Sequence, residues 1–384
     1  MIEVKENKEF KDHKVINGEN MKQGWEIKKL GEVGTVITGS TPSTKDEDNY
    51  SSKDYCFVKP SDISNESISL IQETEAYISE KAYSKCRKLP QGSVLTTCIG
   101  IIGKVGILKV DATCNQQING IIPNKDIIIS EFLAYSLISC KKYLQGIANA
   151  PVVPIINKKE FSEVSIPVPP LAEQEKIVAE LDCLSGVIEK KKQQLKELDA
   201  LAESIFYTMF GDPITNEKGW GVKKFEECYK LASGNGLSAK QIIDGEYPVY
   251  GGNGIVGYHH EYNLDGNNII IGRVGALCGN VRNVEGEAFI TDNAFILTKK
   301  IDNDNVFLLH LLRIHNLRKY AREAMQPVIS NAGLKNIDII ITPIALQQEF
   351  ADKIEAIEEQ KELIKQSITE TEELFNSRMD YYFN

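Results

Sequence analysis

Apolar residues recur in alternating steps of three and four along two stretches of the chain, 177–209 and 350–382. This spacing places them on one face of a helix and is typical of a coiled-coil seam. The expected seam residues are Ile177, Leu181, Leu184, Ile188, Leu195, Leu198 and Ile205 in the first stretch, and Phe350, Ile354, Ile357, Ile364, Ile368 and Phe375 in the second. The pattern predicts two spacer helices, each about 40 residues and about 60 Å long.

The second stretch is a copy of the first, because adding 173 to each position of the first seam gives a position of the second. Each stretch begins beside proline, at Pro169 and Pro170 and again at Pro343, and proline is common at helix starts. A globular segment separates the two helices, so the second must run back along the first for their apolar stripes to meet. The sequence therefore predicts an intramolecular antiparallel coiled coil. A helical hairpin that serves stability alone is the alternative interpretation.

The globular segments are also duplicated. The sequence Gly-Trp-Glu-Ile-Lys-Lys-Leu at 24–30 returns as Gly-Trp-Gly-Val-Lys-Lys-Phe at 219–225, and the same shift of 195 places Gly39 on Gly234. Further along, the shift falls to 176, and Pro154 finally falls on Pro327 at a shift of 173. The falling shift indicates extra loop residues in the first copy, which we expect in the polar stretch 45–67.

The repeat divides the chain into four parts and predicts an α+β fold, with two similar mixed α/β domains joined by two long helices. The parts are a first domain at 1–168 with an N-terminal extension at 1–24, a central spacer helix at 169–212, a second domain at 213–342 and a C-terminal spacer helix at 343–384. Strands are expected at 33–38, 93–99, 105–110, 118–122, 247–250, 268–271 and 288–297, and domain helices at 130–144 and 306–324.

Polar, glycine-rich loops fall at corresponding places in both copies. Arginine and lysine donate to guanine, asparagine and glutamine pair with adenine, and glycine lets a backbone approach a phosphate closely. The candidate DNA-binding residues are Thr38, Gly39, Ser40, Thr41, Lys59, Ser61, Lys104, Asn115 and Gln116 in the first copy, and Ser233, Asn235, Tyr250, Asn253, Arg273, Asn280, Arg282 and Asn293 in the second. Any one loop reads equally well as an ordinary turn. The same chemistry in both copies favours nucleic-acid recognition.

Composition limits the class of protein. The chain is 42% hydrophobic and 26% charged, as expected for a folded protein, and its net charge of −10 lies almost wholly in the two helical segments, which leaves the globular segments near neutral. The eight cysteines form no CxxC pair, so we expect buried thiols in a reducing compartment. Apolar runs are far shorter than the ~20 residues of a membrane span, and the expected location is the cytoplasm.

Enzyme motifs fail on their context. A GxGxxG pattern at 252–257 is followed by Tyr258, His259 and His260 where a dinucleotide-binding helix should begin. No GxxxxGK[ST] phosphate loop and no Asn-Pro-Pro-aromatic methyltransferase motif occurs in the sequence. The histidines lack metal-like spacing, since His310 and His315 are five apart on a predicted helix. We therefore predict neither catalytic residues nor a metal site.

Several phrases of the sequence resemble the specificity (S) subunit of type I restriction-modification systems. They are the Gly-Trp openings at Trp25 and Trp220, the phrases at 247–255 and 271–275, and the helix opening at 170–175. The resemblance covers nearly the full chain. It implies two target-recognition domains that each read half of a bipartite double-stranded DNA target, with helices that set the spacing. It also implies docking of two methylation (M) subunits, restriction (R) subunits in the full complex, and S-adenosylmethionine bound by the methylation subunit, with no cofactor on this chain and no membrane.

Two other functions stay open at this point. The duplicated domains could form a protein-only adaptor that never touches bases, or the turn at 252–257 could serve a nucleotide-dependent enzyme. Substitution of Arg273 and Asn253 separates the adaptor from the DNA reader, because only a reader changes its sequence preference. Cofactor binding by the isolated chain would identify the enzyme.

Overall fold

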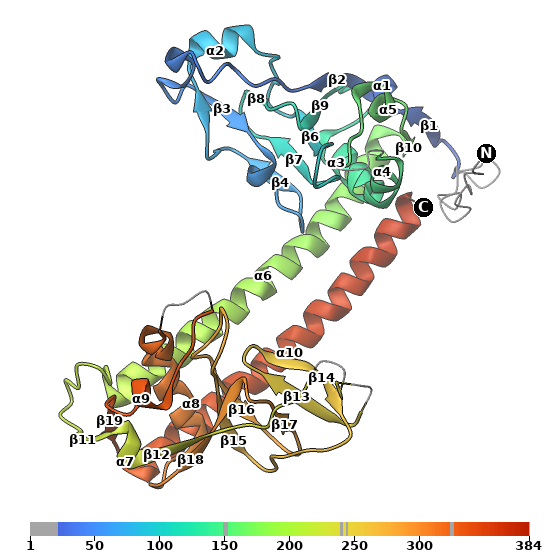
Figure 1. Cartoon of the computed structure of the whole chain (residues 1–384). Coiled ribbons are helices and arrows are strands. Elements are labelled where there is room, and N and C mark those ends of the chain that lie inside the picture. The colour runs from blue at the N-terminus through green and yellow to red at the C-terminus, as the bar shows by residue number, and fades with distance from the viewer. Residues whose placement is uncertain (1–21, 149–152, 239–240, 243–244, 323–325, 384) are drawn as a thin grey trace, which may run out of the picture. The chain divides into compact units, whose positions relative to one another are not determined.

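The computed structural model describes residues 22–148, 153–238, 241–242, 245–322 and 326–383, so most of the predicted N-terminal extension lies outside the described residues (Figure 1). The chain divides into two compact units. Unit 1 comprises residues 1–190 and 368–384, and unit 2 comprises residues 191–367. Each unit holds one globular part and one half of each long helix.

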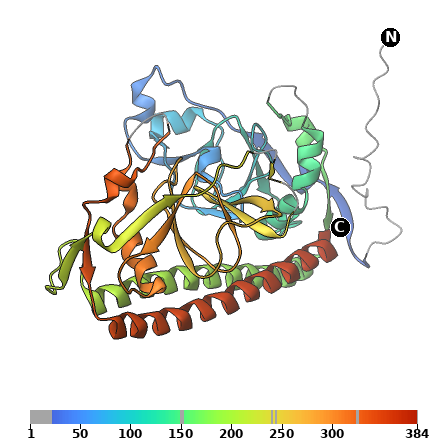
Figure 2. The same ribbon diagram turned by 60° about the horizontal axis from the view of Figure 1, so that its bottom comes forward.

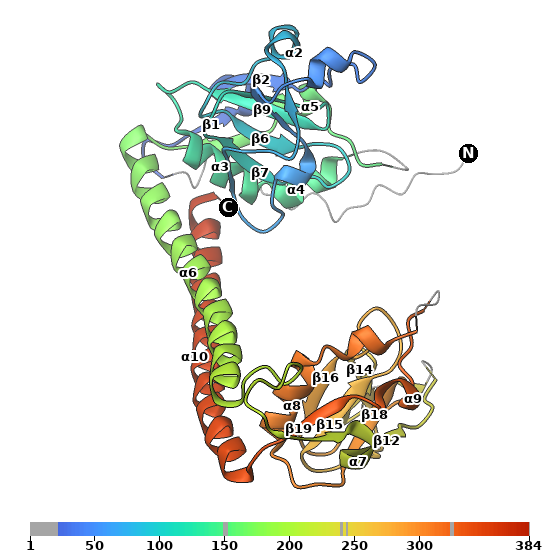
Figure 3. The same cartoon turned by 90° about the vertical axis from the view of Figure 1, so that its left-hand side faces the viewer.

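The two long helices are α6, Leu171–Phe210, and α10, Ile344–Phe383. They lie side by side in Figures 2 and 3. In unit 1, Arg378 Nη2 donates to Glu180 Oε2 at 3.0 Å, which places the end of α10 against the start of α6. In unit 2, Lys361 Nζ lies 2.7 Å from Asp199 Oδ1, which places the start of α10 against the end of α6. The pair is therefore antiparallel, as the sequence predicts.

The seam between α6 and α10 is apolar towards its ends and partly polar near its middle. The buried predicted residues are Ile177, Leu181, Ile188, Phe350, Ile354, Ile357 and Ile368. The half-buried ones are Leu184, Leu195, Leu198, Ile205, Ile364 and Phe375. At the seam position Lys191, the ammonium donates to the hydroxyl and the carbonyl oxygen of Ser367. A polar pair inside an apolar seam disfavours shifted alignments of the two helices, because a shift would bury the ammonium against apolar side chains.

Glu180 anchors the unit 1 end of the helix pair. It accepts hydrogen bonds from Arg378 and, at 2.6 Å, from the hydroxyl of Tyr382, and these bonds lower the pKa of its carboxyl group. Glu180→Gln should reduce the free energy of unfolding at pH 7 by only about 0.5 kcal/mol, because the ion pair is partly exposed to screening solvent. Since the folded-state pKa is depressed, this stabilisation is present above the ordinary pKa of 4.5 and lost as the pH falls through the lowered value.

Urea unfolding at pH 7 and at pH 3 checks this expectation, with the exposed Glu175→Gln on the same helix as control. A Glu180→Gln effect of the same size at both pH values would contradict it.

Unit 1 contains three sheets, ordered β2-β9-β6-β7-β4, β5-β3-β8 and β1-β10. Its strands are β1 Glu26–Lys29, β2 Gly34–Thr38, β3 Tyr55–Val58, β4 Ser69–Ile71, β5 Tyr77–Ile78, β6 Val94–Thr97, β7 Val105–Leu108, β8 Ala112–Cys114, β9 Ile118–Pro123 and β10 Ser165–Val168. Its helices besides the long pair are α1 Leu30–Val33, η3 Glu47–Tyr50, η4 Pro60–Asp62, α2 Glu80–Lys85, α3 Ser130–Ser139, α4 Lys141–Ile147 and α5 Lys158–Ser162.

Unit 2 repeats this plan with sheets ordered β12-β18-β15-β16, β14-β13-β17 and β11-β19. Its strands are β11 Gly221–Lys224, β12 Tyr229–Ser233, β13 Tyr247–Gly251, β14 Gly254–His259, β15 Asn268–Gly272, β16 Val281–Val284, β17 Phe289–Ile290, β18 Ala294–Lys299 and β19 Asp338–Ile341. Its shorter helices are α7 Phe225–Cys228, α8 Asn305–Ile314, η6 Leu317–Tyr320 and α9 Asn331–Leu334.

A matching pair of glycines shows how closely the two folds agree. A Cβ atom on Gly39 would lie 2.3 Å from the carbonyl oxygen of Cys114, and one on Gly234 would lie 2.3 Å from that of Ile290. The next residue in each copy donates across the same crossing, Ser40 N to Cys114 O at 2.9 Å and Asn235 N to Ile290 O at 3.0 Å. Only glycine permits this approach. The duplication read from the sequence is therefore a duplication of the fold.

A buried glutamine ties each long helix to the globular part at its start. In unit 1, Gln174 Nε2 donates to the carbonyl oxygens of Ile127 and Pro169, both at 2.8 Å, and Oε1 accepts from Ile129 N at 3.0 Å. In unit 2, Gln347 Nε2 donates to Thr342 O at 3.0 Å, and Oε1 accepts from Asp304 N at 2.9 Å. Both glutamines are almost fully buried. Each helix is thus a part of its unit's core.

Several sequence expectations about single elements were wrong. The strand predicted at 288–297 is split into β17 and β18 by a turn at 291–293, and the helix predicted at 306–324 ends at Ile314 because Asn316 takes a left-handed conformation with φ 49°. The first predicted strand starts at Gly34, because Val33 ends α1, and the helix predicted at 130–144 is interrupted at Cys140.

Most of the extra residues of the first copy lie between Val58 and Val94, a span that begins within the predicted stretch 45–67. Strand pairing equates Val58 with Tyr250 and Val94 with Ile269, since each pair occupies the same place opposite the neighbouring strand. The first copy has η4, β4, β5 and α2 between these points, where the second has only β14. Polar composition marks a loop, but it does not locate the point where two copies diverge.

All eight cysteines are free, and all but Cys86 and Cys183 are buried.

Within the part of the chain that the structure describes, no helix combines the length and apolar character needed to cross a membrane.

Candidate nucleic-acid interface

In unit 1, the predicted residues of two loops meet at the ends of β2 and β8. Thr41 Oγ1 donates to Gln116 Oε1 at 2.5 Å, and Asn115 N donates to Val58 O at 3.0 Å. Thr41 and Gln116 are exposed, whereas Thr38, Ser40 and Asn115 are half-buried and Gly39 is buried. The glycine crossing therefore brings hydroxyl and amide groups together on one exposed surface.

A second group in unit 1 surrounds the turn η4. Lys104 Nζ donates to the carbonyl oxygen of Pro60 at 2.8 Å, and Lys59 N donates to Asp62 Oδ2 at 2.7 Å. Ser61 lies exposed in the same turn. Lys104 thus uses one of its three donors to hold the turn, and it retains two for a ligand.

In unit 2, Arg273 is weakly held. Its Nη1 lies 3.5 Å from both Ser233 Oγ and Asp292 O, at the outer limit of a hydrogen bond, and its guanidinium lies 5.3 Å from the centre of the Phe295 ring. Its Nε is buried and finds no hydrogen-bond partner among the described residues. Exposed Asn235 and Asn293 flank this side chain along the loops at 233–235 and 291–293. A guanidinium with free donors is suited to a base edge or a phosphate.

The turn between β13 and β14 carries a second arginine in a different state. Arg282 Nη2 donates to the carbonyl oxygen of Asn253 at 2.9 Å, and its Cζ lies 3.3 Å from the position of a Cβ on Gly254. Asn253 is exposed at the tip of the turn, and half-buried Tyr250 precedes it. The Asn280 carbonyl oxygen accepts from Gly272 N at 2.9 Å. Arg282 therefore holds the turn through Nη2, whereas the Nη1 of Arg273 makes only long contacts, and the Nε of both arginines is buried without a partner among the described residues.

The structure brings the candidates of each unit onto corresponding loops. In the second copy, Thr291 N donates to Tyr250 O at 2.9 Å, as Asn115 N does to Val58 O in the first. The scaffold is the same and the side chains on it differ.

Sequence reasoning missed one cation of this surface. Exposed Arg87 donates from Nη1 to the carbonyl oxygen of Thr38 at 2.7 Å. The bridges Leu89–Ala112 and Leu264–Ala288 equate Leu89 with Leu264, so Arg87 corresponds to Tyr262 in the second copy, and the comparison of copies gave no signal because the two side chains differ.

The GxGxxG pattern at 252–257 and the histidines lie in settings that differ from those of enzyme sites. The pattern at 252–257 lies in the hairpin of β13 and β14, with a strand where a dinucleotide site needs a helix. Among the described residues, no group of three or more His, Cys, Asp or Glu side chains could hold a metal ion. His310 packs edge-on against Phe350, and burial lowers its pKa to about 4.

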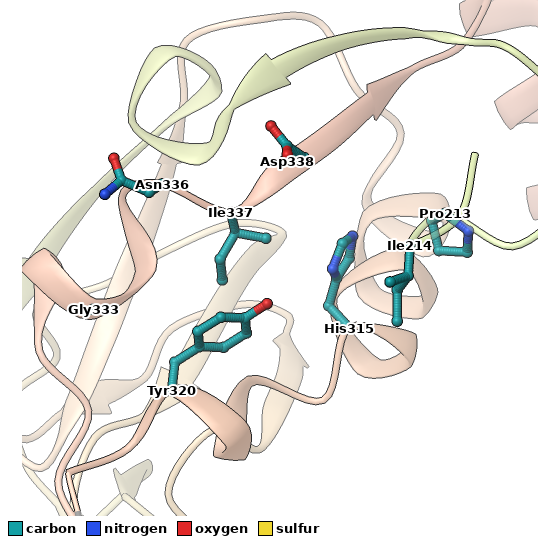
Figure 4. Close-up of a pocket in the computed structure, with 8 residues that line it drawn as sticks. All are labelled: Pro213, Ile214, His315, Tyr320, Gly333, Asn336, Ile337 and Asp338. Atoms are coloured by element: carbon teal, nitrogen blue, oxygen red, sulfur yellow. The ribbon is translucent and has the colours of Figure 1, made fainter.

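Unit 2 also contains a cavity of about 410 Å³ (Figure 4). Its lining residues are Pro213, Ile214, His315, Tyr320, Gly333, Asn336, Ile337 and Asp338. His315 is buried, and desolvation lowers its pKa, so its imidazole is neutral at pH 7. The lining includes none of the predicted DNA-binding residues.

The fold agrees with the comparison to known proteins. Residues 22–200 and 217–373 match the model of the type I restriction modification DNA specificity domain. This chain belongs to that family. The two matched stretches correspond to the two copies of the repeat, each with the helix that follows it.

Relatives of known type match large parts of the chain. The type I restriction enzyme MjaIX specificity subunit of Methanocaldococcus jannaschii is 33% identical over 261 residues, which cover 63% of this chain and 59% of the relative. The type I restriction enzyme EcoprrI specificity subunit of Escherichia coli is 26% identical over 367 residues, which cover 91% of this chain and 90% of the relative.

Solved structures share the whole fold. The S subunit of the type I restriction-modification system from M. genitalium is 15% identical, with a TM-score of 0.61 and coverage of 95% of this chain and 97% of that chain. A chain from a study of complex assembly and conformational transition of the type I R-M system is 17% identical, with a TM-score of 0.59 and coverage of 94% and 97%.

Proposed function

We propose that this chain is the DNA sequence-specificity subunit of a type I restriction-modification complex, in which the domains at 1–168 and 213–342 each read half of a bipartite target. The observation that carries this proposal is the repeated scaffold, which presents a polar loop cluster in each unit with different side chains. Because side chains at base edges determine the sequence that is read, the two half-sites differ. No catalytic role is assigned to the chain.

The helices at 169–212 and 343–384 set the distance between half-sites and dock two methylation subunits in this proposal. Exposed apolar side chains on α10, Leu363 at 68% and Leu374 at 50%, support a protein contact there. The methylation subunits bind S-adenosylmethionine, and restriction subunits join in the full complex. The free, mostly buried thiols support the proposal that the protein acts on DNA in the reducing environment of the cytoplasm.

Near-neutral globular segments indicate that much of the phosphate affinity comes from the methylation subunits. The isolated chain should therefore bind DNA weakly and acquire a bipartite preference when it is assembled with its methylation partner. Methylome sequencing of the host with and without the gene tests this and names the bases. DNA methylation by the chain alone would contradict the proposal.

Arg273→Ala should relax the preference at one base position in the half-site read by unit 2, by about ten- to a hundredfold, because one arginine contact to a base edge contributes about 1–3 kcal/mol. The measurement is methylation of target variants by the reconstituted complex. Lys230→Ala, which removes an exposed cation from β12 of the same unit, is the matched control. An unchanged preference in both half-sites after substitution of Arg273 and Asn253 would favour the protein-only adaptor.

A further inference from the structure

Each globular part carries a loop whose tip is a large aliphatic side chain exposed to solvent. Ile101 is 60% exposed in the loop at 98–103, and Leu277 is 51% exposed in the loop at 273–279. The residue after each tip, Ile102 or Cys278, is buried. Single exposed aliphatic residues are common, but these two occupy the same place in both copies of the repeat.

Equivalent hydrogen bonds hold the two loops. Gly103 N donates to Thr97 O at 2.9 Å, and Gly279 N donates to Gly272 O at 2.7 Å. Gly100 N donates to Pro154 O at 3.0 Å, as Gly275 N does to Pro327 O at 3.1 Å. The backbone that presents each tip is therefore fixed on both sides, and a contact made by the tip loses little conformational entropy on binding.

A glycine allows the inner side of each loop to pack closely against the globular part that carries it. Gly103 and Gly279 have φ values of +85° and +86°, a conformation that side-chain-bearing residues rarely adopt. A Cβ atom would lie 2.7 Å from Lys141 Cγ in the first copy and 2.5 Å from Arg318 N in the second. Both glycines have been kept where the neighbouring side chains changed, which indicates that the position of the tip matters in both copies.

The tips adjoin the candidate nucleic-acid interface. Lys104, which reaches Pro60 O at 2.8 Å, directly follows the first loop, and Arg273 opens the second. A Cβ atom on Gly272 would lie 2.3 Å from Gly252 O and 3.3 Å from Leu277 O, which places the second loop against the turn that carries Asn253. Cationic and polar groups adjoin each tip, and the first tip also lies in the loop that bonds to Pro154, which the exposed Val153 and Ile155 flank. A base edge needs one apolar contact among polar ones, whereas a protein partner would bury a broad, largely apolar core.

We propose that Ile101 and Leu277 are the apolar base contacts of the two domains, each packing against a thymine methyl group in the major groove of its own half-site. The C5-methyl group of thymine is the apolar feature of the major-groove edges, and aliphatic side chains recognise it. This inference rests on the proposed function, and it adds the kind of base that each domain recognises.

The test uses the reconstituted complex with the methylation subunit and DNA in which thymines of one half-site are replaced by deoxyuridine, which lacks only the methyl group. Replacement at one position should weaken binding roughly three- to tenfold, because burial of one methyl group corresponds to about fourfold in affinity. Leu277→Ala should weaken binding to the thymine target by a similar factor and remove the difference between thymine and deoxyuridine. Ile101→Ala should do the same in the other half-site only.

Ile27→Ala and Val222→Ala, which truncate side chains 36% and 46% exposed on β1 and β11, are matched controls and should leave the thymine preference intact. The inference is overturned if the loss of affinity caused by deoxyuridine and the loss caused by the alanine substitution simply add. It is also overturned if a half-site contains no thymine. A third contrary result is that the alanine variants bind DNA normally but no longer bind the methylation subunit. A complex that keeps its bipartite preference in these cases overturns this inference alone. A complex with no preference at all overturns the proposed function.

Discussion

A complex in which both spacer helices are lengthened by one heptad should methylate a target whose half-sites lie about three base pairs further apart. Seven helical residues add about 10.5 Å, and one base pair of B-DNA spans about 3.4 Å. The insertions belong between Lys190 and Lys191 in α6 and between Ser367 and Ile368 in α10. The bonds from Lys191 to Ser367 place these two points opposite each other, so all other pairs of the seam are kept.

Insertion into α6 alone is the matched control. It displaces one helix by a heptad, so the Glu180–Arg378 pair and the Asp199–Lys361 pair can no longer form together. We expect that variant to lose stability and assembly. Target libraries with graded gaps measure the result, and an unchanged gap in a folded double-insertion variant would show that the helices do not determine the spacing.

Gln174→Leu should lower the free energy of unfolding by about 3 kcal/mol or more. Leucine fills the volume but leaves the buried carbonyl group of Pro169, and the half-buried carbonyl group of Ile127 and N–H group of Ile129, without the partners described above, and each unsatisfied buried group costs about 1–3 kcal/mol. Gln347→Leu should act in the same direction in unit 2. Urea unfolding followed by circular dichroism measures the change.

Gln193→Leu on the exposed face of α6 is the control, because the Gln193 amide donates to the nearby Glu197 on the helix surface and does not tie the helix to a globular part. An effect of Gln174→Leu as small as that of Gln193→Leu would refute the anchoring role. Separate unfolding transitions in the two single variants would further show that each glutamine stabilises its own unit.

The architecture was accessible from the sequence because its signals are periodic or duplicated. Apolar residues spaced alternately three and four apart all fall on one face of a helix, which predicts the helix pair. Gly39 and Gly234 each mark the same backbone crossing, once in each copy. Local boundaries were less accessible. Residues 291–293 form a turn inside an apolar run, and the left-handed Asn316 ends α8 within a pattern that still reads as helical.

The candidate site was predictable as a set of loops but not as a set of roles. Lys104 and Arg282 resemble free cations in the sequence, yet both donate to carbonyl oxygens of neighbouring turns. Arg273 looks the same in the sequence and is the one held by contacts of 3.5 Å. These differences depend on which turn lies beside each cation, a tertiary relation that spacing along the chain does not encode.

The division of the chain also orders its biosynthesis. Unit 2 is continuous in sequence, whereas Met379 and Phe383 from α10 complete the core of unit 1. A ribosome therefore releases the whole of residues 191–367 before the last part of unit 1 emerges. The half that is translated first is the half that finishes folding last, and until then the places of Met379 and Phe383 in its apolar core stay open.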